Sequence, residues 1–214
     1  MASKEIVEAV KNAINEKNNK KRKFIQSVDL IINLKDVDLS RPENRIDEEI
    51  ELPKGRGKDA KIAVFATGEL ALKAKEVTNK VIMPDEIKEL AEDKKKAKSI
   101  AEEYDLFIAE ASLMPLIGKS LGKILAPRGK MPKPVPPEIN IGELVGKLKK
   151  SVKVRSKDKP FIHCMVGKEN MSVEDIAENI EAVLHRVEGR LERGRMNIAS
   201  AYVKTTMGFP VRVI

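Results

Sequence analysis

The stretch KIAVFAT, at residues 61–67, is a short apolar run, and Gly68 and the helical pattern ELALKAKEV follow it directly. Such a run is typical of a buried parallel strand that leads into a helix. A second apolar segment, YDLFI at residues 104–108, comes after another stretch with helical periodicity. Strands that alternate with helices predict an α/β unit with a parallel sheet between about residues 60 and 155.

The N-terminal part of the chain has a different pattern. Apolar residues recur at helical spacing over residues 4–17, which predicts a first helix. Residues 24–34, FIQSVDLIINL, are rich in branched side chains with polar residues between them, which predicts a strand. Ile50 and Leu52 are expected in a partner strand.

The C-terminal part resembles the N-terminal part in its mixture of elements. Residues 161–166 and 198–204 predict strands, and Ser172, with acidic residues just after it, predicts the start of a helix. We therefore expect an α+β split domain formed by both chain ends, residues 1–60 plus 157–214. An inserted α/β domain would occupy residues 61–156.

Composition limits the class of protein. Apolar residues make up 42% of the 214 residues, enough for a proper core. The formal net charge of +8, from 41 basic and 33 acidic residues, suggests a polyanionic partner, although a well-solvated surface would give the same count. A single cysteine, Cys164, excludes a disulfide within one chain. With no secretory h-region and no apolar run that could cross a bilayer, we expect a soluble, cytoplasmic protein without membrane contact.

Aromatic residues are scarce, at 3% of the chain with no Trp. Proteins that bind single strands use aromatic rings to stack on splayed bases. If the partner is nucleic acid, the main terms are therefore phosphate neutralisation and recognition of a folded shape.

The positive charge is clustered in the middle of the chain, where residues 67–156 hold 18 basic and 13 acidic side chains. Residues 111–137 contain no acid, and a second basic run covers residues 147–159. Both clusters could contact phosphate weakly or could simply be solvated.

Several patterns look chemical but lack their context. GKSLG at residues 118–122 matches the nucleophile pattern of serine hydrolases, but the required preceding strand is replaced by SLMPLI, with Pro115 inside it. A phosphate-binding loop there would need Gly at position 113, which is Leu. His163 and His185 have no second metal ligand at suitable spacing, so we expect no metal and no cofactor.

Two charged segments allow structural interpretations. KGRGK at residues 54–58 could clamp phosphate or serve as a flexible, solvated hinge, and its position between the two expected domains favours the hinge. Residues 186–195 mix acids with arginines, which favours a salt-bridged surface helix.

Four stretches carry a specific resemblance to a known family. Residues 23–58, KFIQSVDLIINLKDVDLSRPENRIDEEIELPKGRGK, resemble the signature of the ribosomal protein L1 family in its archaeal version. LAPRGKMPKPVPP at 125–137, FIHCMVGK at 161–168 and SAYVKTTMG at 200–208 agree with it. The resemblance spans nearly the whole chain, and its motifs are long.

The resemblance implies a fold and a function. The fold is the split domain with an inserted Rossmann-like α/β domain. The function is that of a non-enzymatic constituent of the mobile side stalk of the large ribosomal subunit, monomeric outside the ribosome. Its expected partners are a hairpin-and-junction region of large-subunit rRNA, exit-site tRNA whose release it assists, and its own mRNA, whose translation it represses.

The resemblance also implies the residues that contact RNA. They lie on the strand after the first helix and near the C-terminus: Lys23, Phe24, Ser27, Asp29, Ser200, Thr205, Thr206, Met207 and Gly208. Secondary contacts are expected from a further set: Arg155, Lys157, Lys159, His163, Lys168, Arg128, Lys130 and Lys133. Many bacterial members have Thr and Glu in place of Ser27 and Asp29.

Short polar side chains suit structured RNA, whose shallow minor groove displays 2′-hydroxyls and base edges. We expect Ser27 and Thr206 to exchange hydrogen bonds with ribose or base edges, and Asp29 to accept from a 2′-OH or a base amino group. Gly208 would let the backbone approach closely, and Met207 would cover a ribose or base face. Phe24 and Met207 could equally belong to the core.

Two other functions remain as alternatives to a ribosomal protein. One is an assembly factor that binds pre-rRNA transiently. The other, from a different class, is a serine hydrolase that uses Ser120.

Overall fold

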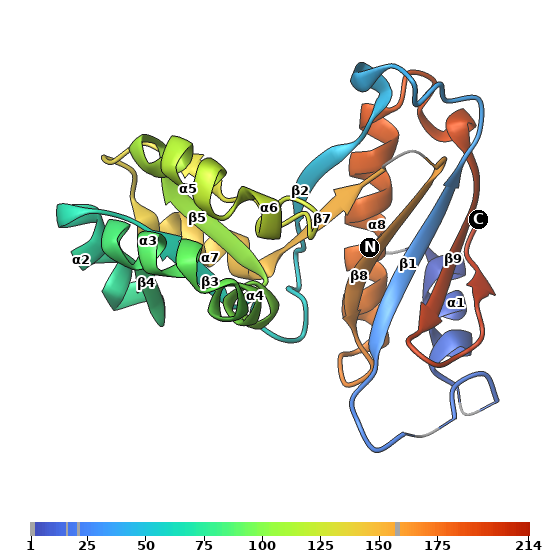
Figure 1. Cartoon of the computed structure of the whole chain (residues 1–214). Coiled ribbons are helices and arrows are strands. Elements are labelled where there is room, and N and C mark those ends of the chain that lie inside the picture. The colour runs from blue at the N-terminus through green and yellow to red at the C-terminus, as the bar shows by residue number, and fades with distance from the viewer. Residues whose placement is uncertain (1–2, 16, 21, 157–158) are drawn as a thin grey trace. The chain divides into compact units, whose positions relative to one another are not determined.

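The computed structural model describes residues 3–15, 17–20, 22–156 and 159–214, and it has a mixed α/β fold with three sheets (Figure 1). The chain divides into two compact units. One comprises Met1–Asp59 with Lys150–Ile214, and the other comprises Ala60–Lys149. Each unit has its own hydrophobic core.

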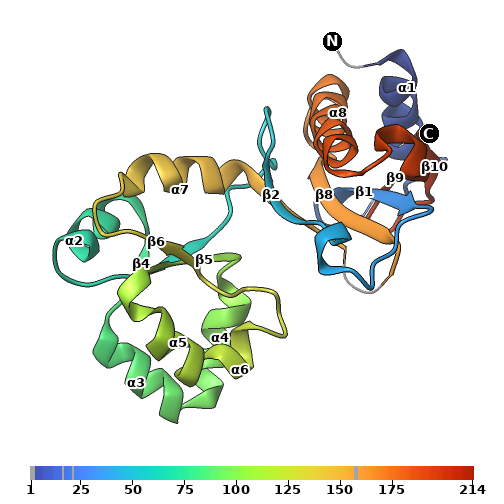
Figure 2. The same ribbon diagram turned by 90° about the horizontal axis from the view of Figure 1, so that it is seen from above.

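The first unit is built on a four-stranded antiparallel sheet of order β10-β9-β1-β8. Its strands are β1 (Ser27–Leu34), β8 (Phe161–Lys168), β9 (Ile198–Thr205) and β10 (Val211–Arg212). Helices α1 (Lys4–Ile14) and α8 (Val173–Arg190) lie on one face of this sheet (Figure 2). Along β1, half-buried and fully buried residues alternate, so that Val28, Leu30 and Ile32 face the helices.

A short two-stranded ribbon also belongs to the first unit. It pairs β2 (Asp47–Glu51) antiparallel with β7 (Ser151–Arg155), and the 3-10 turns η1 (Pro42–Asn44) and η3 (Gly194–Asn197) lie elsewhere in the same unit. The expected partner strand thus contains Ile50, while the buried Leu52 follows its end. The expected domain boundary at residue 156 differs from the observed division at residue 150, because the pairing of β7 with β2 joins residues 151–155 to the chain ends.

The second unit contains a parallel sheet of order β4-β3-β5-β6. All four residues of β3 (Ile62–Phe65) are buried, because helices cover both faces of the sheet (Figure 2). The prediction that KIAVFAT forms a buried parallel strand leading into a helix is confirmed. The other elements are α2 (Gly68–Val77), β4 (Lys80–Ile82), α3 (Pro84–Glu92), α4 (Lys94–Glu103), β5 (Leu106–Glu110), η2 (Ala111–Leu113), α5 (Met114–Ser120), α6 (Gly122–Leu125), β6 (Lys133–Val135) and α7 (Ile141–Lys150).

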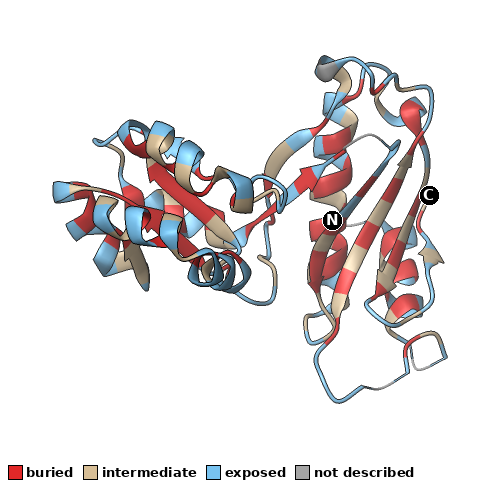
Figure 3. Ribbon diagram, viewed as in Figure 1, coloured by how far each residue is buried: buried red, intermediate tan, exposed pale blue. Residues whose placement is uncertain are grey.

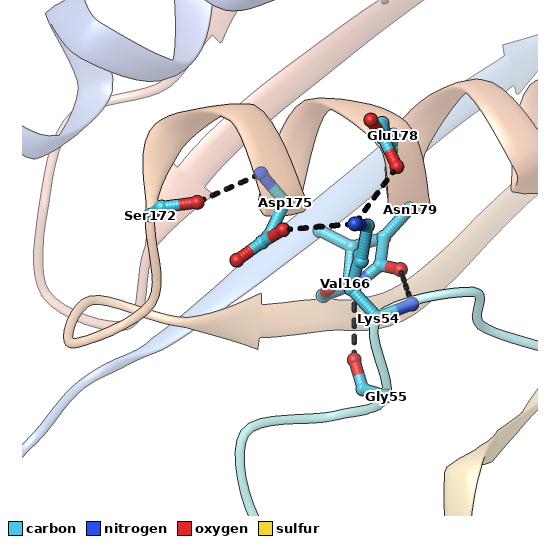
Figure 4. Close-up of polar contacts among 7 residues, drawn as sticks. All are labelled: Lys54, Gly55, Val166, Ser172, Asp175, Glu178 and Asn179. Carbon is cyan, nitrogen blue, oxygen red and sulfur yellow. Dashed lines mark hydrogen bonds and ion pairs between the residues drawn. The ribbon is translucent and has the colours of Figure 1, made fainter.

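The start of α8 was predicted correctly from the sequence, whereas the end of α1 and the start of β1 were not. The Ser172 hydroxyl accepts a hydrogen bond from Asp175 N at 3.1 Å, as expected of the residue that begins α8 (Figure 4). The first helix ends at Ile14, three residues before the expected end, and β1 starts at Ser27 rather than at residue 24.

The KGRGK loop is held against α8. Asn179, which is fully buried, accepts a hydrogen bond from Lys54 N at 3.0 Å and donates to the carbonyls of Gly55 and Val166, both at 2.9 Å (Figure 4). The Lys54 ammonium lies 3.5 Å from the carboxylates of Asp175 and Glu178. These contacts tie residues 54–55 to both α8 and β8, which is not the arrangement of a freely solvated hinge.

Glycine is required within this loop. Gly55 and Gly57 have φ angles of 70° and 73°, a region that L side chains rarely adopt. A Cβ on Gly57 would also lie 2.9 Å from the sulfur of Met171. The loop therefore combines left-handed backbone with close packing.

We expect Asn179→Ala to lower the free energy of unfolding by about 2–3 kcal/mol, because three polar backbone groups lose a buried partner. Urea denaturation followed by circular dichroism would measure this loss, and hydrogen exchange at the Lys54 amide should become faster. Glu178→Ala, which removes only an exposed ion pair, is the matched control and should cost less than about 1 kcal/mol. Equal stability of both variants would contradict an anchoring role for Asn179.

Candidate nucleic-acid interface

One face of the antiparallel sheet carries accessible polar residues. The half-buried positions of β1 are Ser27, Asp29, Ile31 and Asn33, all on the face opposite α1 and α8 (Figure 3). Residues paired directly across antiparallel strands project from the same face. The pairing therefore extends this face across the neighbouring strands to Ser200, Tyr202 and Lys204 of β9, and to Phe161, His163 and Met165 of β8.

Two segments 179 positions apart in the chain meet at one end of this face. Thr206 N donates to the Ser27 carbonyl at 3.0 Å, and Ser27 N donates to the Thr206 hydroxyl at 3.2 Å. Gly208 N then donates to the Thr205 carbonyl at 3.1 Å, which closes a tight turn. We call residues 206–208 the 206–208 turn. It brings the two groups of expected contacts into one patch.

Asp29 is an acid in a partly buried setting. Its side chain is 19% exposed and lies 3.8 Å from Nε2 of the more exposed His163, while Lys204 is its partner on β9. Burial raises the pKa of Asp29 above its ordinary value, and the nearby His163 and Lys204 offset part of that rise. The carboxylate is thus held in a place that disfavours its charge unless a donor approaches it.

The expected contacts differ in how accessible they are. Phe24 and Met207 are 53% and 57% exposed, so the alternative that they belong to the core is wrong. Lys23 and Thr206 are also exposed. Thr205 is fully buried, and its hydroxyl donates inward to Asn19 Oδ1 at 3.0 Å, so its side chain supports the turn from below.

Ser200 lies at the far end of β9 from the 206–208 turn. Its hydroxyl accepts a hydrogen bond from Asn33 Nδ2 at 2.9 Å, across the strand pair that also holds Ser27 and Asp29. Ser200 therefore shares the face of the sheet with the other expected contacts, but not the patch at the turn.

Among the secondary contacts expected in the first unit, Lys159 and His163 are exposed and Lys168 is half-buried. Arg155 is paired with Asp47 at 3.3 Å. Lys157 lies outside the described residues. Lys168 is the register partner of Ser27, which places it next to the patch at the turn.

The basic residues of the second unit are partly engaged in the fold. Lys130 Nζ donates to the carbonyls of Ala101 and Tyr104, both at 2.8 Å, at the C-terminal end of α4. Arg128 is paired with Glu102 at 3.3 Å, and Lys133 is exposed on β6. Lys130 thus has a structural role that its sequence context did not reveal.

The hydrolase interpretation of GKSLG is wrong. Ser120 ends helix α5, and Gly122 begins helix α6, whereas a nucleophile elbow places its serine on a sharp turn between a strand and a helix. Both histidines lie in the other unit.

No group of three or more His, Cys, Asp and Glu side chains in the described part of the chain could hold a metal ion. No helix in it is long and apolar enough to cross a membrane.

Sequence reasoning missed several residues of this region. Tyr202 and Lys204 lie on the accessible face, and Phe209, 67% exposed, follows the 206–208 turn. Gln26 is fully buried beneath the turn. A signal existed for Gln26, because strand alternation puts it in phase with Val28 and Leu30 on the core face.

Comparisons with known proteins agree on one family. The model of the ribosomal protein L1p/L10e family matches residues 8–209. A "Large ribosomal subunit protein uL1" from Methanothermobacter thermautotrophicus is 54% identical over 211 residues, which cover 98% of this chain and 99% of that protein. The counterpart from Methanothermococcus thermolithotrophicus is 53% identical over 100% of this chain and 99% of that protein. The counterpart from Pyrococcus horikoshii is 54% identical over 97% of this chain and 94% of that protein.

The fold and these matches define a class of structural, non-enzymatic ribosomal proteins. Within that class, the chain belongs to the ribosomal protein L1p/L10e family and is of the archaeal type.

We expect Asp29→Asn to be at least as stable as the unchanged protein at pH 7. The folded state raises the pKa of Asp29, so folding is favoured when this carboxyl is protonated. As the pH rises through the pKa of Asp29 in the folded protein, the carboxyl ionises and this contribution to stability is lost, whereas the Asn variant is unaffected. Below its ordinary pKa of 3.8, both proteins hold an uncharged side chain and the difference should be smallest. Urea denaturation at a series of pH values measures this.

The control is Glu138→Gln, which removes an exposed carboxylate. A stability advantage of Asp29→Asn that shrinks with rising pH would contradict the assigned cause.

Proposed function

We propose that this protein binds rRNA of the large ribosomal subunit as a structural constituent of the cytoplasmic ribosome. Support comes first from its relatives, which are named as large-subunit ribosomal proteins. The observation that carries the proposal is the direct hydrogen bonding of Ser27 to Thr206, which joins the two groups of expected contacts into one accessible patch.

The chemistry of the patch suits structured RNA. It combines the hydroxyls of Ser27 and Thr206 with the Asp29 carboxylate, and Phe24 and Met207, close to them in the sequence, are exposed. Hydroxyls can both donate to and accept from a 2′-OH, and an ionised carboxylate can only accept. An acid would repel phosphate, so Asp29 selects for a 2′-OH or a base amino group.

Finer parts of the proposal concern where and when the protein acts. We place it at the side stalk, where it assists release of exit-site tRNA, and we assign it repression of its own mRNA through a structure like its rRNA target. In this proposal the chain ends form the rRNA-binding domain. The Rossmann-like inserted domain uses Arg128 and Lys133 for weaker contacts with RNA. The free protein is a monomer.

We expect Thr206→Ala and Asp29→Ala each to weaken binding to the large-subunit rRNA fragment by about 1–3 kcal/mol, which is typical of specifying contacts. Binding to an unrelated duplex should change little. Filter binding at fixed salt measures both affinities, and footprinting on large-subunit rRNA locates the target. Matched controls are Ser99→Ala and Glu138→Gln, at exposed positions of the second unit. Wild-type affinity of both test variants would exclude the proposed patch.

A separate prediction concerns phosphate contact. Lys23 is exposed just before β1. Lys23→Ala should reduce the slope of log affinity against log salt by about one, and it should weaken binding to every RNA by a similar factor. Thr206→Ala should leave that slope unchanged, because it removes no counterion-releasing charge. A salt series from about 50 to 200 mM distinguishes the two effects. An unchanged slope for Lys23→Ala would place this lysine outside the RNA footprint.

A further inference from the structure

A buried polar cluster lies directly beneath the 206–208 turn. Its three members are Asn19, Gln26 and Thr205, of which Gln26 and Thr205 are fully buried and Asn19 is 7% exposed. They come from the connection between α1 and β1 and from the end of β9, which hydrogen bonds bring side by side (Figure 1). Buried polar groups are retained only when their hydrogen bonds are satisfied, and these are.

Gln26 links the turn to the preceding connection. Its Nε2 donates to Asn19 Oδ1 at 2.7 Å, and its Oε1 accepts from Met207 N at 2.9 Å. The backbone amide of Met207, in the middle of the turn, is therefore held by a side chain that is itself held inside the protein. Among the described residues, no other side chain forms a hydrogen bond to the backbone of Met207.

Glu169 sets the direction of the hydrogen bonds in this cluster. Its Oε1 accepts from Gln26 N at 3.0 Å, and its Oε2 accepts from Asn19 Nδ2 at 3.3 Å. With its amide nitrogen directed at Glu169, Asn19 must present Oδ1 to Gln26 Nε2 and to the Thr205 hydroxyl. Gln26 in turn must present Oε1 to Met207 N, so the amide orientations follow from chemistry.

Gly208 supplies a second attachment. Phe209 N donates to the Asn18 carbonyl at 3.0 Å, and a Cβ on Gly208 would lie 3.0 Å from that same carbonyl oxygen and closer still to the Thr205 hydroxyl. Its φ is not in the left-handed region. Glycine is thus required here by close approach within the protein, in addition to the approach of RNA expected from the sequence.

We propose that Gln26, Asn19 and Glu169 are positioning residues for RNA recognition, which hold the 206–208 turn in its binding conformation before RNA arrives. This inference rests on the proposed function. A turn that is already ordered does not lose conformational freedom on binding, so its contacts contribute fully to affinity. Gln26 and Asn19 act without touching RNA, since both are buried, and Glu169 acts through its hydrogen bonds to them.

The test is Gln26→Met, which keeps the length of the side chain but removes both hydrogen bonds. We expect the dissociation constant for the rRNA fragment to rise about tenfold, because the turn must then be ordered during binding. The salt slope should stay unchanged, since no phosphate contact is lost. Hydrogen exchange at the Met207 and Gly208 amides should become about tenfold faster, while exchange of the α8 amides should stay unchanged.

Asn179→Ala is the matched control. It removes a fully buried amide from the same unit but has no hydrogen bond to the turn. It should lower stability and leave the affinity of the folded protein unchanged. If Gln26→Met and Asn179→Ala weaken RNA binding equally, the effect is one of general stability and the positioning role is wrong.

A double-mutant cycle gives a sharper readout. If Gln26 acts through the turn, the double variant Gln26→Met/Thr206→Ala should lose less RNA affinity than the sum of the losses in the two single variants. Additive effects would contradict the proposal. If Gln26→Met does not unfold cooperatively, Glu169→Ala at a half-buried position is the second variant, and wild-type exchange and affinity there would overturn the proposal.

The single variants separate the positioning role from the proposed function. Weakened binding by Thr206→Ala and Asp29→Ala, with wild-type binding by Gln26→Met, would reject the positioning role and keep the RNA-binding patch. Wild-type binding by all of these variants would reject the patch itself.

Discussion

The position of β1 between β8 and β9 is the constraint on which the first unit depends. Both neighbours come from the C-terminal part of the chain, and both pair antiparallel with β1. Because strand side chains alternate, this register sends Gln26, Val28 and Leu30 inward and Ser27 and Asp29 outward. A slip of one residue would exchange the two sets, so the hydrophobic core itself fixes which polar groups are accessible. The register with β8 also shifts between Val28 and Asp29, so that this acid lies beside an irregularity.

The same region departs from local stability rules. Asp29 is kept where burial raises its pKa, and Gln26, just before β1, places an amide at an inward-facing position that a branched apolar side chain would fill. Both choices have a cost in the isolated protein, since a charged or polar group is moved away from water. Such departures are expected at binding sites, where groups must be held ready for a partner. The cluster around Gln26 satisfies its hydrogen bonds internally. Asp29 has only the His163 imidazole nearby, at 3.8 Å, and in the proposed function its carboxylate accepts a hydrogen bond from RNA.

Much of the fold could be predicted from local patterns. KIAVFAT predicted a strand buried on both faces because its residues are continuously apolar, and Ser172 predicted a helix start because its hydroxyl can accept from the first turn. The division at residue 150 could not be predicted, because it depends on β7 pairing with β2 from about a hundred positions earlier in the chain. The inward direction of Thr205 was predictable from its phase with Ala201 and Val203. The role of Lys130 was not, because its carbonyl partners become neighbours only when α4 is placed.

Net charge is a poor guide to the patch at the turn. The middle of the chain carries most of the positive excess, yet Lys130 caps a helix, and Arg128 and Arg155 are paired with acids. Exposed ion pairs of this kind contribute little to stability, and RNA phosphates can replace their acidic partners at little cost. In the proposed function, Arg128 and Arg155 therefore suit capture of RNA at low specificity, with an affinity that falls as salt rises. The patch with Ser27, Asp29 and Thr206 depends on geometry rather than charge, so a preformed turn matters more there than an additional lysine would.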